Sequence, residues 1–182
     1  DDVARLHETP EHVSRPLRPG LGVVPRATVA ADTSIPHPLI AAAAARPDAV
    51  AAVSAAGAVS YATLIDQVAR AAGSLAARGV SCGDVVAYDG PADLDWLVGF
   101  HALGWLGAVI APVREPADAS DVDHVVASHS IAAGEHVPPE AWSLAAPRLL
   151  LATSGSTGTP QRVTLTTGQP VSAASSAVEP AA

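Results

Sequence analysis

DVVAYDGPADLDWLVGFHALGWLGAVIAPV, residues 84–113, holds one long apolar run between two short ones. The run at 94–106 is long enough for a helix, whereas 84–88 and 107–113 have the length of strands. Both short runs are apolar on both faces, which is typical of parallel strands that are covered by helices. The segment therefore predicts a strand, helix and strand unit of an α/β fold with a largely parallel sheet.

Elements of both kinds precede this unit. Residues 39–45 predict a helix that ends at a proline, and 49–54 with 58–61 predict a hairpin around a small turn. Apolar side chains recur at helical spacing over 61–76, and Gly79 follows where a helix cap is needed. This last stretch predicts a helix with one buried face.

After the central unit the pattern is weaker. Residues 121–130 predict a further short helix, and the proline-containing stretch 133–146 predicts a loop. A buried strand is expected at 149–153 and another strand at 162–166, on either side of a cluster of Gly, Ser and Thr. Residues 171–178 have weak helical character.

The chain divides into two regions by composition. Residues 1–36 contain five prolines without a sustained hydrophobic period, which predicts a linker or an arm on the surface. Residues 37–182 are expected to form one α/β domain, because a chain of 182 residues has the size of a single domain.

Composition excludes several classes of partner. The formal net charge of -8 comes from scattered acidic residues, and no basic stripe is present, so a nucleic acid is not expected as a partner. No apolar run reaches about 18 residues, so no membrane partner is expected. The single cysteine, Cys82, excludes an internal disulfide. The N-terminus lacks the features of a secretory signal, and a cytoplasmic protein is expected.

One segment carries residues suited to chemistry. Residues 153–160 contain five hydroxyl side chains and two glycines directly after an apolar strand. Backbone N–H groups of such a loop can converge on an anion, and hydroxyls can donate to phosphate oxygens, although the same composition also occurs in plain flexible loops. It differs from the P-loop of NTPases, which needs a lysine that this chain lacks. The expected nucleotide- or phosphate-binding residues are Thr153, Ser154, Gly155, Ser156, Thr157, Gly158 and Thr159.

SGSTGTP at 154–160 resembles the phosphate-binding motif of the adenylate-forming superfamily, which includes acyl-CoA synthetases, luciferases and adenylation domains of nonribosomal peptide synthetases. Further segments resemble landmarks of the same superfamily in the same order: 46–51, 59–64, 79–86, 103–112 and 162–166. The resemblance covers about Leu39 to Ala174. It implies the N-terminal subdomain of an adenylation domain, with ATP or AMP and Mg²⁺ as its ligands.

The sequence also departs from the superfamily pattern. Gln161 stands where the superfamily usually has a lysine, and Arg162 stands where it usually has a glycine. A neutral amide can donate hydrogen bonds but cannot offset phosphate charge, so nucleotide binding is expected to be weak or absent. Arg162 is a doubtful substitute, because neighbours on a strand point to opposite faces. The acid pocket and the catalytic lysine of the superfamily lie downstream of the matching region.

These points favour a truncated or inactive adenylation domain of an assembly-line synthetase, of the nonribosomal peptide or polyketide kind. The expected role is structural or docking, with no catalytic residue and no metal ligand in this chain. Its expected partner is a neighbouring domain or a second polypeptide of a biosynthetic complex. Two alternatives stay open: the N-terminal half of a working acid–AMP ligase that other sequence completes, and a stand-alone nucleotide- or phosphate-binding module.

Other candidate residues have simple structural explanations. His124, His129 and His136 lie near acidic residues, but their spacing does not place them on one helical face, so solvated side chains are expected. His101 lies in the apolar helix and is expected to be packed there. Cys82 has no base assigned to it, and Ser156 lacks the Gly-x-Ser-x-Gly pattern of a hydrolase. Asp93 and Asp95 suit the start of a helix, and Trp96, Phe100 and Trp105 are expected in the core.

Overall fold

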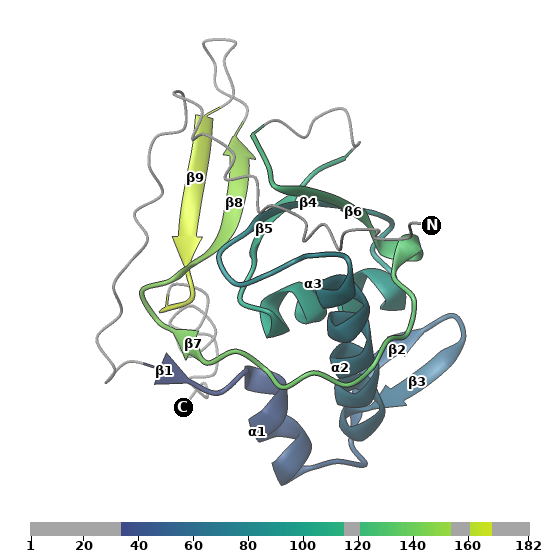
Figure 1. The fold of residues 1–182 in the computed structure, drawn as a ribbon. Helices are drawn as coiled ribbons and strands as arrows, with labels where there is room; N and C mark the ends of the chain where they lie inside the picture. The colour runs from purple at the N-terminus through teal and green to yellow at the C-terminus, as the bar shows by residue number, and fades with distance from the viewer. Residues whose placement is uncertain (1–33, 115–120, 154–160, 169–182) are drawn as a thin grey trace, which may run out of the picture.

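The computed structural model describes residues 34–114, 121–153 and 161–168, and a sheet of five strands lies at its centre (Figure 1). The strands are arranged in the order β6 (His124–Ala127), β4 (Val85–Asp89), β5 (Val109–Pro112), β8 (Pro147–Thr153) and β9 (Gln161–Thr166). β4 pairs in parallel with β5 and β6, and β5 pairs in parallel with β8, whereas β9 is antiparallel to β8. The predicted α/β fold with a largely parallel sheet is confirmed.

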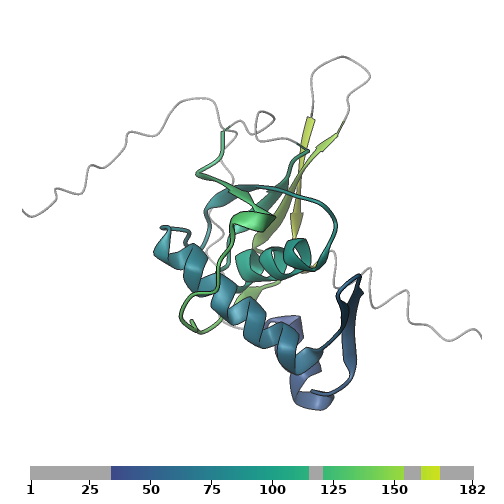
Figure 2. The same ribbon diagram turned by 90° about the vertical axis from the view of Figure 1, so that its right-hand side faces the viewer.

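Two helices, α2 (Tyr61–Ala77) and α3 (Leu94–Trp105), pack against each other and against one face of this sheet (Figure 2). The helices contribute Leu64, Val68, Leu75 and Leu103 to this core, and the sheet contributes Val86 and Ile110, all of them buried. Ser60 and Asp93 cap the helix starts, since their side chains accept the N–H groups of Thr63 and Trp96. No helix in the described part of the chain has the length and apolarity that a membrane span requires.

Tyr88 connects β4 to α3. Its side chain is fully buried, and its hydroxyl donates a hydrogen bond to the carbonyl oxygen of Trp96 at 3.0 Å. Gly99 of α3 faces the phenol, and a Cβ at this position would overlap the tyrosine oxygen. Glycine is therefore needed in the middle of this helix, because the strand and the helix approach too closely for a side chain.

The N-terminal part of the described chain adds a short helix and a hairpin. α1 spans Pro38–Ala45, and β2 (Val50–Ser54) and β3 (Gly57–Ser60) pair in antiparallel fashion, as predicted. Residues 1–33 of the predicted linker lie outside the described residues. Ser34–Ile35, which the sequence assigned to that linker, form strand β1 and pair with β7 (Trp142–Ser143).

The short helix predicted over 121–130 was wrong. His124–Ala127 form strand β6, which pairs in parallel with β4, and Ser128–Ser130 then form one 3₁₀ turn. The adjacent residues Val125 and Val126 favour a strand, and Asp123 fixes its start because its carboxylate accepts the N–H of Val85 at 2.8 Å. The loop predicted at 133–146 likewise contains β7, and the weak helix predicted at 171–178 lies outside the described residues.

The segment after β6 crosses α2 at very short range. The N–H of Gly134 donates to the carbonyl oxygen of Arg70 at 2.9 Å. A Cβ at Gly73 would overlap the carbonyl oxygen of Glu135, and a Cβ at Gly134 would overlap the backbone of Ser74. Backbone therefore packs directly on backbone at this crossing.

A buried polar cluster joins the N-terminal elements to the core. His37 is fully buried, and its ring lies 4.6 Å from that of Trp142, 5.2 Å from that of Trp105 and 5.5 Å from that of His101. Its Nδ1 accepts the N–H of Leu39 and so caps α1. His37 must therefore be neutral to cap this helix.

Gly73→Ala tests the backbone crossing. Alanine normally stabilises a helix interior by about 1 kcal/mol relative to glycine. Here the added methyl group has no space, so we expect the free energy of unfolding to fall by about 2–3 kcal/mol, as in an overpacked core. Denaturant unfolding would measure this change, with Ser74→Ala as the control in the same turn. A Gly73→Ala protein as stable as the parent would contradict the crossing.

Acid is expected to weaken the fold through the histidine cluster. Burial lowers the pKa of His37 to about 3, with smaller contributions from His101 and Arg148, and burial lowers the pKa of His101 to about 4. The unfolded chain therefore binds protons first as the pH falls below about 6.5. The free energy of unfolding does not depend on these two histidines well above that pH. Between pH 7.5 and pH 5 we expect it to fall by about 4 kcal/mol because of the two histidines together.

His37→Asn separates this effect from general acid sensitivity. Asparagine keeps an acceptor for the start of α1 but does not titrate. Denaturant unfolding between pH 5 and 7.5 is expected to show about half the pH dependence of the parent. An unchanged slope would mean that His37 is not the group that responds.

Candidate functional site

Parallel pairing brings four strand ends to the same edge of the sheet. β4 ends at Asp89, β5 at Pro112, β6 at Ala127 and β8 at Thr153, all at the carboxyl edge. Ligands of open α/β sheets bind outside the carboxyl ends of the strands. This edge is therefore the place to look for a site.

The predicted phosphate-binding segment connects two neighbouring strands at this edge. Thr153 ends β8 and Gln161 begins β9, and the two residues are partners in the antiparallel register. The predicted residues between them, Ser154, Gly155, Ser156, Thr157, Gly158 and Thr159, lie outside the described residues. The structure thus places the two ends of the loop and leaves its phosphate-binding role a prediction.

The base of β8 is fixed by a buried arginine. Arg148 is 6% exposed, and its Nη1 donates to the carbonyl oxygens of Gly104 and Ala108, each at 3.2 Å. Its guanidinium carbon lies 3.9 Å from the ring centroid of Trp142, a cation–π contact. Burial lowers the pKa of Arg148 to about 10, so the side chain remains charged at neutral pH. The strand that leads to the loop is thereby attached to α3 and to the start of β5.

Two arginines lie at or just beyond this edge of the sheet. Arg162 is the second residue of β9, and its Nη1 lies 3.8 Å from Oδ2 of Asp121. Arg114 follows the end of β5 by two residues and is exposed. Because β5 is adjacent to β8, Arg114 belongs to the same edge as the loop.

Sequence reasoning missed Arg114. The signal was present, because an arginine directly after a predicted strand lies at a strand end. What the sequence did not supply was the strand order, which makes β5 the neighbour of β8.

Two enclosed polar atoms lie at the ends of β4 and β6. Oδ1 of Asp89 and Oγ of Ser128 are both buried and have no hydrogen-bond partner among the described residues. Ser128 packs against Gly90, whose φ of 140° lies in a region that favours glycine. The edge therefore combines a loop attachment, two cations and enclosed hydrogen-bonding groups.

Three of the other candidate residues, His124, His136 and Cys82, lie elsewhere in the fold. His124 Nε2 lies 3.2 Å from Asp84 at the amino ends of β6 and β4, and His136 Nε2 lies 2.9 Å from Asp66 on α2. Cys82 is exposed in the turn before β4. Across residues 34–114, 121–153 and 161–168, no group of three His, Cys, Asp or Glu side chains is placed to bind a metal.

Sequence comparison identifies relatives over most of the described region. Residues 39–134 match the family described as AMP-binding enzyme. Feruloyl-CoA synthase of Amycolatopsis sp. is 38% identical over 112 residues, which are 60% of this chain and 23% of that protein. Phenyloxazoline synthase MbtB of Mycobacterium sp. (strain MCS) is 36% identical over 77 residues, 41% of this chain and 7% of that protein. The chain thus spans less than a quarter of the length of these curated relatives.

Solved structures share the fold. O-succinylbenzoate CoA synthetase (MenE) of Bacillus subtilis, in complex with AMP, has a TM-score of 0.70 at 24% identity, covering 80% of this chain and 46% of that chain. The N-terminal subdomain of Klebsiella oxytoca NpsA has a TM-score of 0.63 at 23% identity, covering 74% and 42%. The described α/β unit therefore corresponds to part of the N-terminal subdomain of adenylate-forming enzymes.

Proposed function

Because the chain belongs to the AMP-binding enzyme family, we propose that its carboxyl edge binds the phosphates of ATP or AMP, as part of an enzyme that activates a carboxylic acid. The observation that carries the proposal is the attachment of Thr153 and Gln161 to adjacent strands at that edge. The family match ends at residue 134, so the assignment of the loop rests on its motif and on this placement. MenE, whose structure contains AMP, supports the choice of ligand.

In this proposal the loop residues Thr153 to Thr159 surround the phosphates. Their backbone N–H groups and hydroxyls donate hydrogen bonds to phosphate oxygens, and the glycines allow the backbone to come close. Mg²⁺, when bound with the nucleotide, would neutralise part of the phosphate charge. The described residues include no group of His, Cys, Asp or Glu side chains that could hold a metal ion, so no ligand of the ion is assigned.

Arg162 and Arg114 are proposed to supply the charge that the missing lysine would give. The pair of Arg162 with Asp121 is long, at 3.8 Å, and partly exposed, with relative exposures of 33% and 63%. Such pairs contribute about 1 kcal/mol or less, so a phosphate can compete for the guanidinium. Asp121 would thus weaken nucleotide binding by holding Arg162.

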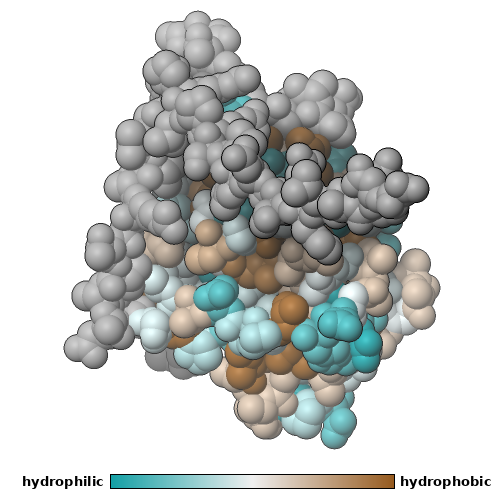
Figure 3. All heavy atoms as spheres, in the orientation of Figure 1, coloured by the Kyte–Doolittle hydropathy of each residue, from teal (hydrophilic) through white to brown (hydrophobic). Residues whose placement is uncertain are grey.

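Chemistry on the acid is proposed to require a neighbouring domain or a second polypeptide of a biosynthetic complex. The curated relatives include an acyl-CoA synthase and an oxazoline-forming synthase, and both are much longer than the matched segment. Exposed Val125 and Val163 lie on the two edge strands of the described sheet, and Figure 3 shows further apolar residues at the surface. These residues are proposed to contribute to the contact. On its own, this chain would bind the nucleotide but would not react it with the acid.

Calorimetric titration with ATP tests the phosphate site. Thr157→Ala removes one hydroxyl donor to a charged oxygen and is expected to weaken binding about tenfold. Arg162→Gln is expected to weaken binding to a similar extent, whereas Asp121→Asn should tighten it about threefold because it removes one anion that competes with the phosphate for Arg162. Gln161→Lys should tighten it about fivefold by adding charge.

Arg78→Gln provides the control, since it makes the same change of charge at the C-terminal cap of α2. It is expected to leave ATP binding unchanged. The proposal would be wrong if the chain binds no ATP, or if Arg78→Gln and Arg162→Gln have equal effects.

Pyrophosphate exchange distinguishes the possible roles of the chain. The 182-residue chain is expected to show no acid-dependent exchange between ATP and pyrophosphate, although it binds ATP. Exchange by the chain alone would instead favour a complete catalyst. Exchange that appears only with a second polypeptide would favour the half-enzyme over a purely structural role.

A further inference from the structure

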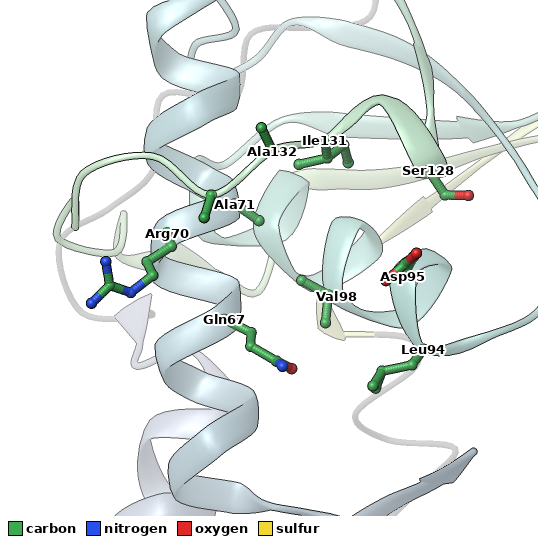
Figure 4. A pocket seen from close by; sticks show the side chains of 10 residues that line it. Gln67, Arg70, Ala71, Leu94, Asp95, Val98, Ser128, Ile131 and Ala132 are labelled. Carbon is green, nitrogen blue, oxygen red and sulfur yellow. The ribbon is translucent and has the colours of Figure 1, made fainter. Parts of the chain in front are cut away.

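A groove lies beside the contact between α2 and α3, the two helices that cover one face of the sheet. It lies between α2, α3 and residues 131–133, and its volume is about 180 Å³ (Figure 4). A cavity of about 150 Å³ can hold benzene, so this groove has space for about six non-hydrogen atoms. Nothing in the proposed phosphate site uses it.

The polar residues that line the groove are Gln67, Arg70, Asp95 and Ser128. Gln67 extends from α2 toward α3, and its Oε1 is enclosed without a partner among the described residues. Asp95, in the first turn of α3, contributes an exposed carboxylate. Arg70 also borders the groove, but its side chain points away from α3 and its Nε donates to Asp66 at 3.1 Å. The groove therefore presents an amide oxygen and a carboxylate without a cation between them.

The electrostatic environment has the same sign. Burial raises the pKa of Tyr88 well above its usual value, and the carboxylates of Asp93, Asp95 and Asp89 raise it further. Three acidic groups thus act on the phenol that lies under the start of α3. A positive ligand is favoured at this end of the helix pair.

The remaining walls are apolar. Ala71 contributes from α2, Val98 from α3 and Ile131 with Ala132 from the crossing segment (Figure 4). An alkyl chain can pack between these side chains while a charged end reaches the acceptors. The groove combines an apolar channel with one negatively charged end.

We propose that this groove binds a small organic cation, a primary ammonium group on an aliphatic chain of about five carbons. The ammonium donates hydrogen bonds to Gln67 Oε1 and to the Asp95 carboxylate, and the chain lies against Ala71, Val98 and Ile131. The same chemistry occurs in a free alkylamine and in the lysine side chain of a partner protein. This chain has no lysine of its own that could fill the site.

Titration with pentylammonium, followed by two-dimensional NMR of the ¹⁵N- and methyl-labelled 182-residue chain, tests the proposal. The side-chain amide of Gln67 and the methyl groups of Val98 and Ile131 should shift saturably, with a Kd of about 1 mM for a ligand of this size. Pentanol should bind at least tenfold more weakly, and pentanoate should not bind. Equal binding of pentanol and pentylammonium would overturn the proposal, as would shifts confined to other residues.

Variants locate the site independently of the spectra. Asp95→Asn is expected to weaken pentylammonium binding about tenfold, whereas Asp48→Asn, the same change on the exposed segment after α1, should leave it unchanged. Ala132→Phe places a large side chain over the groove from an exposed position and should abolish binding. Equal effects of the two aspartate variants, or binding that survives Ala132→Phe, would refute the assignment.

A blocked lysine, N-acetyl-lysine N-methylamide, separates the two sources of the cation. Binding at least as tight as that of pentylammonium would support the lysine of a partner. Binding of pentylammonium but not of the blocked lysine would support a free amine. Failure of both ligands to shift Gln67 would overturn the proposal, and ATP binding by the same sample would show that the phosphate site is a separate question.

Discussion

The hydrogen bond from the buried Tyr88 hydroxyl to the carbonyl oxygen of Trp96 holds α3, the helix between β4 and β5, against β4. This hydrogen bond can form because Gly99 has no side chain, so the phenol can reach the backbone of the helix. With α3 in this position, β5 returns beside β4, and the base of β8 is then attached through Arg148 to the carbonyl oxygens of Gly104 and Ala108. β8 is thus positioned by contacts at its amino end, whereas the predicted phosphate-binding loop is attached at its other end, at Thr153.

Local pattern was sufficient where an element carries its own signal. The helix at 61–77 has a regular apolar face, a serine cap and a following glycine, and the central strand, helix and strand unit has unbroken apolar runs. The two valines of segment 124–127 favour a strand, but a run of four residues is too short to decide between a helix and a strand. Its strand form depends on pairing with β4, which is 35 or more residues away in sequence. The pairing of β1 with β7 depends on residues more than 100 positions apart and could not be inferred from either segment.

The candidate site shows the same limit. Hydroxyl and glycine content predicted the loop, and the structure placed its two ends at the carboxyl edge of the sheet. The charge around it was harder to foresee, because Arg114 becomes relevant only when β5 is known to lie beside β8. Arg162 likewise gains meaning from Asp121, which is 41 residues earlier in the chain and 3.8 Å away in space. Sequence supplies the proposed chemistry of the loop, whereas tertiary pairing determines which charged side chains lie at the same edge of the sheet.

The pairing of Ser34–Ile35 with Trp142–Ser143 also bears on how such a domain can be exchanged between proteins. If two proteins were joined at Pro36, β1 would come from one parent and β7 from the other, although all the described helices would come from a single parent. This junction would also lie next to His37, whose ring packs on Trp142 beside Arg148. A chimera that is meant to keep this unit whole should therefore have its junction before Ser34, so that β1 and its partner strand β7 come from the same parent protein.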